Sequence, residues 1–320
     1  MDELSIAVTS RSFSKNEKLR KLLLSKYKNV KFNEEGLKLE GEQLIHFLKD
    51  CDKAIVALEK ITGKILNQLP KLKLISKYGV GLDNIDFESL QKHNVKLSWK
   101  GGVNKRSVSE LTLSFMLMFT REVWTKAHDL KAGKWNNSQT ASLKHSTVGL
   151  VGFGNIGQDI AKILNIFGAK VIAYDNRELS REFKECLVTP VSLDKLLESS
   201  NFVSIHLPKI KSTSNFVDSD FLKNMNRNAY LINTSRGGIV DEQALYNALC
   251  NNEIAGAAMD VFVTEPEIGS NLFQLHNFIG TPHIAGSSDE GILNMGVAAI
   301  EGLEQGKAAV WENFYEYPDE

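Results

Sequence analysis

Side chains that bind anions and exchange protons follow three apolar runs in the last third of the sequence. Arg236 comes after AYLINTS, Glu265 after GAAMDVFVT and His283 after NFIGTP. A guanidinium binds a carboxylate or phosphate through two parallel hydrogen bonds, and an imidazole gains and loses a proton near neutral pH. Each residue alone also has a structural explanation: a surface ion pair, a charge at a helix N-terminus or a satisfied loop histidine. Their similar placement after successive runs favours a shared site.

A glycine-rich turn lies upstream of these residues. The run TVGLVGFG leads into a helical pattern, which is followed by a second apolar run, KVIAYD. The turn fits G-x-G-x-x-G, in which the first glycine permits a tight turn, the second admits a pyrophosphate and the third allows close packing of helix and strand. The unpaired N–H groups at the helix start would bind the phosphates. We therefore predict dinucleotide binding by Gly152, Gly154, Asn155, Ile156 and Gly157.

The acid that ends the second run indicates which dinucleotide is bound. Asp175 lies 18 residues after Gly157, close to the offset of about 20 expected of the acid that binds the ribose hydroxyls. A carboxylate accepts hydrogen bonds from a 2′-hydroxyl and repels a 2′-phosphate, so NAD is favoured over NADP. Arg177 is the residue that would accommodate the phosphate, and it keeps NADP as the alternative.

These residues need a scaffold, and the apolar pattern provides one. From position 148 onward, strand-like runs alternate with helical patterns, which predicts a parallel sheet covered on both faces. Ligands of such sheets bind beyond the carboxyl ends of the strands. The residues that follow the predicted strands therefore meet at one edge: the 152–157 turn, Asp175, His206–Pro208, Thr234–Arg236, Asp260, Glu265 and His283.

The first hundred residues show the same alternation and predict a smaller α/β unit. A long helix from Ser107 to about Lys131 is expected next, capped by the S-x-x-E pattern of Ser107 and Glu110. A last helix is expected from Glu290 to about Gly306. The chain would then cross between the domains twice, which predicts a domain of residues 1–102 plus 288–320 and an inserted domain of residues 103–287.

Composition excludes several classes of protein. The 320-residue chain has a net charge of −1 and 24% charged residues, so nothing favours binding to nucleic acid or to an anionic membrane. We expect no secretory signal, no membrane span and no metal site. The three cysteines show neither metal-binding nor redox spacing, and we expect reduced thiols in a cytoplasmic protein.

Seven motifs together resemble the D-isomer-specific 2-hydroxyacid dehydrogenases, a family that includes phosphoglycerate, glycerate, D-lactate and glyoxylate/hydroxypyruvate enzymes. They span most of the chain in the family's order: YGVGLDNID (78–86), SVSELTLSFML (107–117), LVGFGNIG (150–157), HLP (206–208), NTSRGGIVDEQAL (233–245), AAMDVFVTEP (257–266) and TPHIAG (281–286). Departures are slight, such as Ser109 where alanine is common. The resemblance implies two doubly wound parallel-sheet domains, a Rossmann NAD-binding domain inserted into a flavodoxin-like substrate domain, and commonly a homodimer.

The resemblance also implies roles for the residues at the sheet edge. NADH would deliver a hydride to C2 of a 2-oxo acid, with His283 as acid and base, Glu265 as the partner that orients its ring, and Arg236 as the group that binds the substrate carboxylate. Backbone N–H groups of Tyr78, Gly79, Val80 and Gly81 would bind the same carboxylate. The remaining implied cofactor contacts are His206, Pro208, Thr234, Ser235, Asp260 and Gly286.

Substrate identity and a regulatory alternative stay open at this stage. Lys77, just before the glycine loop, would either meet a distal phosphate or carboxylate of the substrate or be a solvated surface lysine. Phosphoglycerate enzymes tend to carry arginine here and in the preceding strand, where this chain has Ala57 and Leu58. Glu265 argues against the formate-oxidising relatives, which usually carry glutamine there. The alternative from another class is an NAD(H)-sensing, corepressor-like binding protein on the same scaffold.

Overall fold

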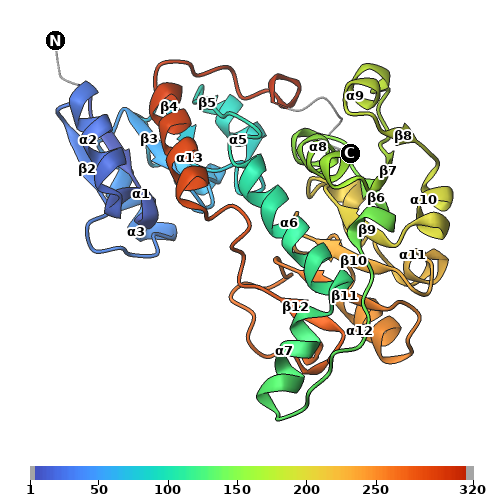
Figure 1. Cartoon of the computed structure of the whole chain (residues 1–320). Helices are drawn as coiled ribbons and strands as arrows, with labels where there is room; N and C mark the ends of the chain where they lie inside the picture. The colour runs from blue at the N-terminus through green and yellow to red at the C-terminus, as the bar shows by residue number, and fades with distance from the viewer. Residues whose placement is uncertain (1–3, 315–320) are drawn as a thin grey trace. The chain divides into compact units, whose positions relative to one another are not determined.

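The computed structural model describes residues 4–314, which divide into two compact units (Figure 1). Unit 1 contains the residues up to Asn104 together with those from Asp289 onward, and unit 2 contains Lys105–Ser288. The predicted fold class, two parallel-sheet α/β domains, is confirmed. We keep the predicted functional domains, 1–102 plus 288–320 and 103–287, as a proposal, because compactness does not show which unit binds which ligand.

Unit 1 is a five-stranded, entirely parallel sheet in the order β2-β1-β3-β4-β5. This is the strand order of flavodoxin-like sheets. Its strands are β1 (Ile6–Val8), β2 (Val30–Phe32), β3 (Lys53–Val56), β4 (Leu74–Lys77) and β5 (Lys96–Ser98). Its helices are α1 (Arg11–Lys15), α2 (Glu17–Lys26), α3 (Gly41–Leu48), α4 (Gly63–Leu66), α5 (Phe87–Lys92) and, from the far end of the chain, α13 (Asp289–Gly302).

Both faces of this sheet are buried, because successive side chains of a strand point to opposite faces. Ile6 and Val8 belong to the core beneath α1, α2 and α13, whereas Ala7 belongs to the core beneath α3, α4 and α5. Helix α13, red in Figure 1, packs against β4, so the C-terminal segment completes a domain begun at the N-terminus.

Unit 2 is a seven-stranded, entirely parallel sheet in the order β12-β11-β10-β9-β6-β7-β8. The order reverses between β6 and β9, which is the switch point where a Rossmann sheet binds its ligand. The strands are β6 (Thr147–Val151), β7 (Lys170–Tyr174), β8 (Thr189–Pro190), β9 (Phe202–Ile205), β10 (Tyr230–Asn233), β11 (Gly256–Met259) and β12 (Phe278–Gly280).

Seven α-helices of the described chain belong to unit 2, and six of them cover the two faces of its sheet. Helices α6, α8 and α9 contribute to one core, and α10, α11 and α12 to the other. Their bounds are α6 (Lys105–Thr120), α7 (Val123–Lys131), α8 (Asn155–Phe167), α9 (Ser180–Glu185), α10 (Leu193–Ser199), α11 (Ser219–Asn224) and α12 (Glu242–Cys250). Among residues 4–314, no helix is both long and apolar enough to cross a membrane.

The predicted helix from Ser107 to Lys131 is wrong in two respects. It is broken into α6 and α7, because Glu122 adopts a left-handed conformation (φ 50°) that stops the first helix. Ser107 is not the cap, because α6 begins two residues earlier at Lys105. The Ser107 hydroxyl instead donates to the carbonyl of Ala285 (2.5 Å) and accepts from the N–H of Ser288 (3.3 Å). Both ends of unit 2 are thus tied together at one side chain.

Candidate active site

The glycine turn connects β6 to α8, and its three glycines differ in what surrounds them. Gly152 has a φ of +95°, and a Cβ there would lie 2.5 Å from the carbonyl oxygen of His206. A Cβ at Gly157 would lie 2.5 Å from the carbonyl oxygen of Gly152. A Cβ at Gly154 would meet only Arg177, at 3.9 Å. The turn is therefore closed by backbone at its two ends and open in the middle, where α8 begins.

Asp175 follows β7 and is held beside this turn. Its Oδ2 accepts from the N–H of Phe153 (2.7 Å) and from Nη2 of Arg177 (3.0 Å), and its Oδ1 accepts from the backbone N–H (3.0 Å) and Nε (2.9 Å) of Arg177. Burial raises the pKa of Asp175, but these hydrogen bonds outweigh it, so the pKa lies below its ordinary value. A carboxylate has about four lone-pair positions, and all of them are occupied.

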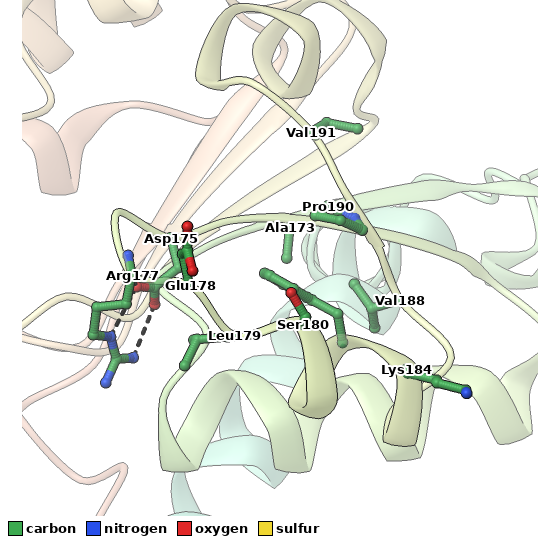
Figure 2. Close-up of a pocket in the computed structure, with 11 residues that line it drawn as sticks. Ala173, Asp175, Arg177, Glu178, Leu179, Ser180, Lys184, Val188, Pro190 and Val191 are labelled. Carbon is green, nitrogen blue, oxygen red and sulfur yellow. Dashed lines mark hydrogen bonds and ion pairs between the residues drawn. The ribbon is translucent and has the colours of Figure 1, made fainter.

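A cavity of about 410 Å³ borders this ion pair (Figure 2). Its apolar lining comes from β7, from α9 and from the segment around β8, and includes Ala173, Val188 and Pro190. Asp175 and Arg177 line the same cavity, and the dashed lines of Figure 2 mark their contact. An apolar hollow beside an ionised carboxylate can admit a ligand with a flat apolar part and a polar hydroxylated part.

His206 and Pro208 follow β9 at the switch point. The N–H of His206 donates to the carbonyl of Val151 (2.8 Å), which joins the ends of β6 and β9. The His206 ring exchanges a hydrogen bond with the Ser204 hydroxyl (2.8 Å), and its Nδ1 is buried. Burial lowers the pKa of His206 to about 3. The ring is therefore neutral near pH 7 and cannot act as a cationic phosphate ligand.

The loop after β10 carries Arg236, and the side chain of Asn233 holds its backbone by hydrogen bonds. The buried Asn233 side chain accepts from the N–H (3.0 Å) and hydroxyl (2.7 Å) of Ser235 and donates to the carbonyl of Arg236 (3.1 Å). The Thr234 hydroxyl shares a hydrogen bond with Thr112 of α6 (2.8 Å). The backbone that presents Arg236 is thus fixed on both sides.

Asp260, after β11, organises the segment after β12. Its fully buried carboxylate accepts from the Thr281 hydroxyl (2.6 Å) and from the N–H groups of Ile284 and Ala285 (2.8 Å each). The N–H of His283 donates to the carbonyl of Asp260 (2.8 Å). His283 itself has a φ of +54°, a conformation that is uncommon for residues other than glycine and is often found at functional sites. Gly286 ends this segment.

Glu265 and His283, 18 residues apart, are brought together. Oε2 of Glu265 lies 2.6 Å from Nδ1 of His283, and the two side chains are 35% and 46% exposed. An ionised carboxylate only accepts hydrogen bonds, so Nδ1 carries a proton and Nε2 is the nitrogen that faces other partners. The other Glu265 oxygen, Oε1, accepts from the N–H of Phe262 (3.0 Å).

Gly237 connects the Arg236 loop to the Glu265 segment. A Cβ at Gly237 would lie 1.8 Å from the carbonyl oxygen of Phe262, so the two backbones touch and only glycine fits. The Arg236 loop therefore packs directly on the segment whose carboxylate holds His283. Arg236, Glu265 and His283 therefore lie on segments of unit 2 that contact one another, although the segments are far apart in sequence.

The predicted substrate loop, Tyr78–Gly81, belongs to unit 1. Tyr78 is buried, accepts a hydrogen bond from the Ser12 hydroxyl (3.2 Å) and has its pKa raised, mainly by burial. Lys77 is only 5% exposed, and its Nζ donates to the carbonyl of Ala57 and to Oδ1 of Asn84. The alternative of a solvated surface lysine is therefore wrong.

Two contacts were beyond prediction from the sequence. The ion pair between Arg177 and Asp175 joins neighbours whose side chains were assigned separate roles. Glu242, at the start of α12, accepts a hydrogen bond from the N–H of Val263 (2.7 Å), and its position in the sequence indicates only a favourable helix N-terminal charge. Among the residues that the structure describes, no group of three or more His, Cys, Asp or Glu could hold a metal ion.

Comparisons with known proteins agree on one family. Residues 113–285 match the model of the D-isomer specific 2-hydroxyacid dehydrogenase NAD-binding domain. The hydroxypyruvate reductase of Thermotoga maritima is 35% identical over 83% of this chain and 88% of its own length. A D-lactate dehydrogenase of Aquifex aeolicus, solved with NAD and lactic acid, superposes with a TM-score of 0.81 at 26% identity over 94% of each chain. An acyclic imino acid reductase, solved with NADPH and D-Arg, has a TM-score of 0.84 at 25% identity over 94% of this chain and 96% of that one.

Proposed function

The chain belongs to the D-isomer specific 2-hydroxyacid dehydrogenase family, and on that premise we propose that it transfers a hydride between NAD(H) and C2 of a small 2-oxo acid. The observation that carries this proposal is the 2.6 Å contact between Glu265 and His283 beyond β12, on the sheet whose β6 leads into the glycine turn. Reduction of a ketone needs a proton donor beside the hydride donor, and this pair supplies one.

His283 is the proposed acid for reduction and the base for oxidation. Its Nδ1 proton is engaged by Glu265, so the proton given to the substrate oxygen comes from Nε2. Loss of that proton leaves the neutral tautomer that the carboxylate already stabilises, and no ring flip is needed. The backbone hydrogen bond to Asp260 positions the residue, and the contact with Glu265 orients its ring.

Arg236 is the proposed ligand of the substrate carboxylate. Its planar guanidinium can form two parallel hydrogen bonds with a carboxylate, which orients the 2-oxo group as well as attracting it. The fixed backbone of the 234–236 loop supports this role, because a mobile arginine would lose orientation. We also assign Tyr78, Gly79, Val80 and Gly81 to substrate binding through their backbone N–H groups.

The open middle of the glycine turn supports binding of a nicotinamide cofactor, which supplies the hydride when bound. We propose NAD in preference to NADP, with the pyrophosphate at Gly154–Gly157 and the ribose hydroxyls at Asp175. Because all lone pairs of Asp175 are occupied, the Arg177 guanidinium must turn away before a ribose hydroxyl can bind. We further propose that His206, Pro208, Thr234, Ser235 and Gly286 line the cofactor site, and that Asp260 acts on its nicotinamide end through the segment that it holds.

We propose a substrate without a phosphate, such as hydroxypyruvate, glyoxylate or pyruvate. Lys77 is the basic residue that could meet a distal phosphate, but it is buried. Its ammonium donates to the carbonyl of Ala57 and to Oδ1 of Asn84. Ala57 and Leu58, which directly follow β3, supply no further cation.

Two properties of the protein complete the proposal. We propose a homodimer formed through the 103–287 domain, since α7 and the following loop expose Val123, Trp124, Leu130 and Trp135. We propose a cytoplasmic location, which the free thiols of Cys51, Cys186 and Cys250 support. Light scattering across a dilution series tests the dimer, because a mass that stays at one chain would contradict it.

The direct test is NADH oxidation against a panel of 2-oxo acids: pyruvate, glyoxylate, hydroxypyruvate, 3-phosphohydroxypyruvate and branched members. We expect turnover with the small, unphosphorylated acids and much weaker turnover with 3-phosphohydroxypyruvate. Protein that binds NADH but oxidises it with none of these acids would contradict the proposal and favour an NAD(H)-sensing role. A preference for the phosphorylated acid would contradict the proposed substrate class alone.

A further inference from the structure

Glu242 is the first residue of α12, but its side chain does not serve that helix. The N-terminus of α12 is capped by Asp241, whose carboxylate accepts from the N–H groups of Gln243 and Ala244 (3.0 Å each). The Glu242 carboxylate instead reaches a segment 21 residues away and accepts from the N–H of Val263 (2.7 Å). Its role must therefore be sought in that segment.

The segment in question is the turn 262–265, which carries the proposed partner of His283. Two successive N–H groups of this turn are held by carboxylates, that of Phe262 by Glu265 (3.0 Å) and that of Val263 by Glu242 (2.7 Å). The first contact leaves Oε2 of Glu265 directed at Nδ1 of His283. The second fixes the backbone on which the first is built.

The same turn also packs against the Arg236 loop. A Cβ at Gly237 would lie 1.8 Å from the carbonyl oxygen of Phe262 and 2.9 Å from the nitrogen of Val263. The turn is thus contacted by both Gly237 and Glu242. Without the Glu242 contact, the N–H of Val263 would lose its hydrogen-bond partner and only the packing against Gly237 would remain.

Burial and neighbouring carboxylates disfavour the ionised form of Glu242. Burial is the largest cause that raises the pKa of Glu242, and Glu267, Asp241 and Glu265 raise it further against the hydrogen bond from Val263. Among these influences the hydrogen bond from Val263 alone favours the carboxylate, so that contact is what Glu242 contributes here.

We propose that Glu242 is a positioning residue for hydride transfer: it fixes the 262–265 turn, and so the Glu265–His283 pair. This inference rests on the proposed function for its kinetic readout. The geometric part can be tested in the cofactor-free protein.

The experiment compares Glu242→Ala, Glu242→Gln and the control Glu267→Gln with the wild-type protein. Glutamine keeps an oxygen that accepts from Val263 and removes the charge, whereas alanine removes both. Glu267→Gln removes a charge from the same surroundings, but the Glu267 carboxylate accepts from the N–H of Gly269 (2.7 Å) rather than from the turn. Thermal unfolding confirms that each variant is folded, and NADH titration measures cofactor affinity.

We expect Glu242→Ala to lower kcat roughly 10-fold to 100-fold, as a misplaced catalytic group does, with the Kd for NADH within about two-fold of wild type. Glu242→Gln should keep kcat near neutral pH within about three-fold, because the hydrogen bond survives. Glu267→Gln should keep kcat near the wild-type value, because its carboxylate does not hold the turn.

Wild-type kcat in Glu242→Ala, or an equal loss of kcat in Glu267→Gln, would overturn the proposal. If Glu242→Ala does not fold, Glu242→Asp decides, because it keeps the charge but shortens the side chain by one methylene and so withdraws the carboxylate from the N–H of Val263. The ring signal of His283 in the cofactor-free proteins is then followed by NMR and assigned with His283→Gln. A ring signal displaced in Glu242→Asp but not in Glu267→Gln supports the proposal, and an unmoved signal overturns it. An inactive wild-type protein would refute the proposed function, but the NMR result would still decide this inference.

Discussion

Substituting Gly152 by alanine should unfold the nucleotide turn, and the structure allows the cost to be worked out. The φ of +95° at Gly152 is one that a residue with a Cβ avoids, at about 1–2 kcal/mol. The added Cβ would lie 2.5 Å from the carbonyl oxygen and 2.8 Å from the carbonyl carbon of His206. These are backbone atoms, so the end of β9 must move, which costs about 1–3 kcal/mol. Together the two effects predict a loss of about 2–5 kcal/mol in unfolding free energy.

Gly154→Ala is the matched substitution two residues away, and it should behave in the opposite way. Gly154 has φ −78° and ψ −155°, and the nearest atom to its Cβ is Nη2 of Arg177 at 3.9 Å. Its unfolding free energy should stay within about 1 kcal/mol of wild type. The methyl group would stand where we place the pyrophosphate. Loss of charge-assisted hydrogen bonds worth about 1.5–3 kcal/mol predicts a Kd for NADH raised about 10-fold to 100-fold.

Urea unfolding of the cofactor-free proteins and fluorescence titration with NADH separate the two effects. The reasoning on Gly152 is refuted if Gly152→Ala unfolds at the wild-type urea concentration with an unchanged m value. The placement of the pyrophosphate is refuted if folded Gly154→Ala binds NADH as tightly as wild type.

Four further substitutions test individual roles. His283→Ala should lower kcat by about 10²–10⁴-fold with NADH binding retained, and unchanged turnover would remove His283 from acid–base catalysis. Arg236→Lys should raise the KM for the 2-oxo acid while the Kd for NADH stays near wild type, and equal losses of both would indicate a structural arginine. Asp175→Ala should narrow the preference for NAD over NADP in steady-state assays, because it removes the carboxylate and releases Arg177 for a 2′-phosphate; an unaltered preference would contradict the cofactor assignment. His206→Gln should make the unfolding free energy less sensitive to acid. The pKa of His206 is the ordinary 6.5 in the unfolded chain and about 3 in the folded one. The neutral ring therefore contributes fully to the unfolding free energy above about pH 6.5, and this contribution is lost as pH falls from there toward 3. Parallel urea midpoints of the two proteins across that range would contradict this account.

The sequence predicts the elements well where the apolar pattern is local. The positions that follow strands, such as Asp175, Asp260 and His283, could be assigned to one sheet edge because parallel strands share their direction. The break between α6 and α7 could not be predicted, because neither glycine nor proline occurs at Arg121–Glu122 and the left-handed backbone depends on tertiary packing.

The candidate site shows the same division between local and distant effects. G-x-G-x-x-G predicts a turn, but only coordinates distinguish the crowded Gly152 from the open Gly154. Ser107 has the spacing of a helix cap, yet its hydroxyl bonds to Ala285, 178 residues away. The contact of Glu242 with Val263 is likewise invisible to any rule that depends on short spacing.

The order of strands in unit 2 has a consequence for how such a protein can change over time. The residues that we assign to nucleotide selection follow β6 and β7, whereas those assigned to proton transfer and carboxylate binding follow β10, β11 and β12, on the other side of β9. Mutations that exchange one dinucleotide for another therefore fall on a different part of the sheet from mutations that alter the reaction. A lineage with this strand order can exchange NAD for NADP while it keeps the residues that carry out the reaction.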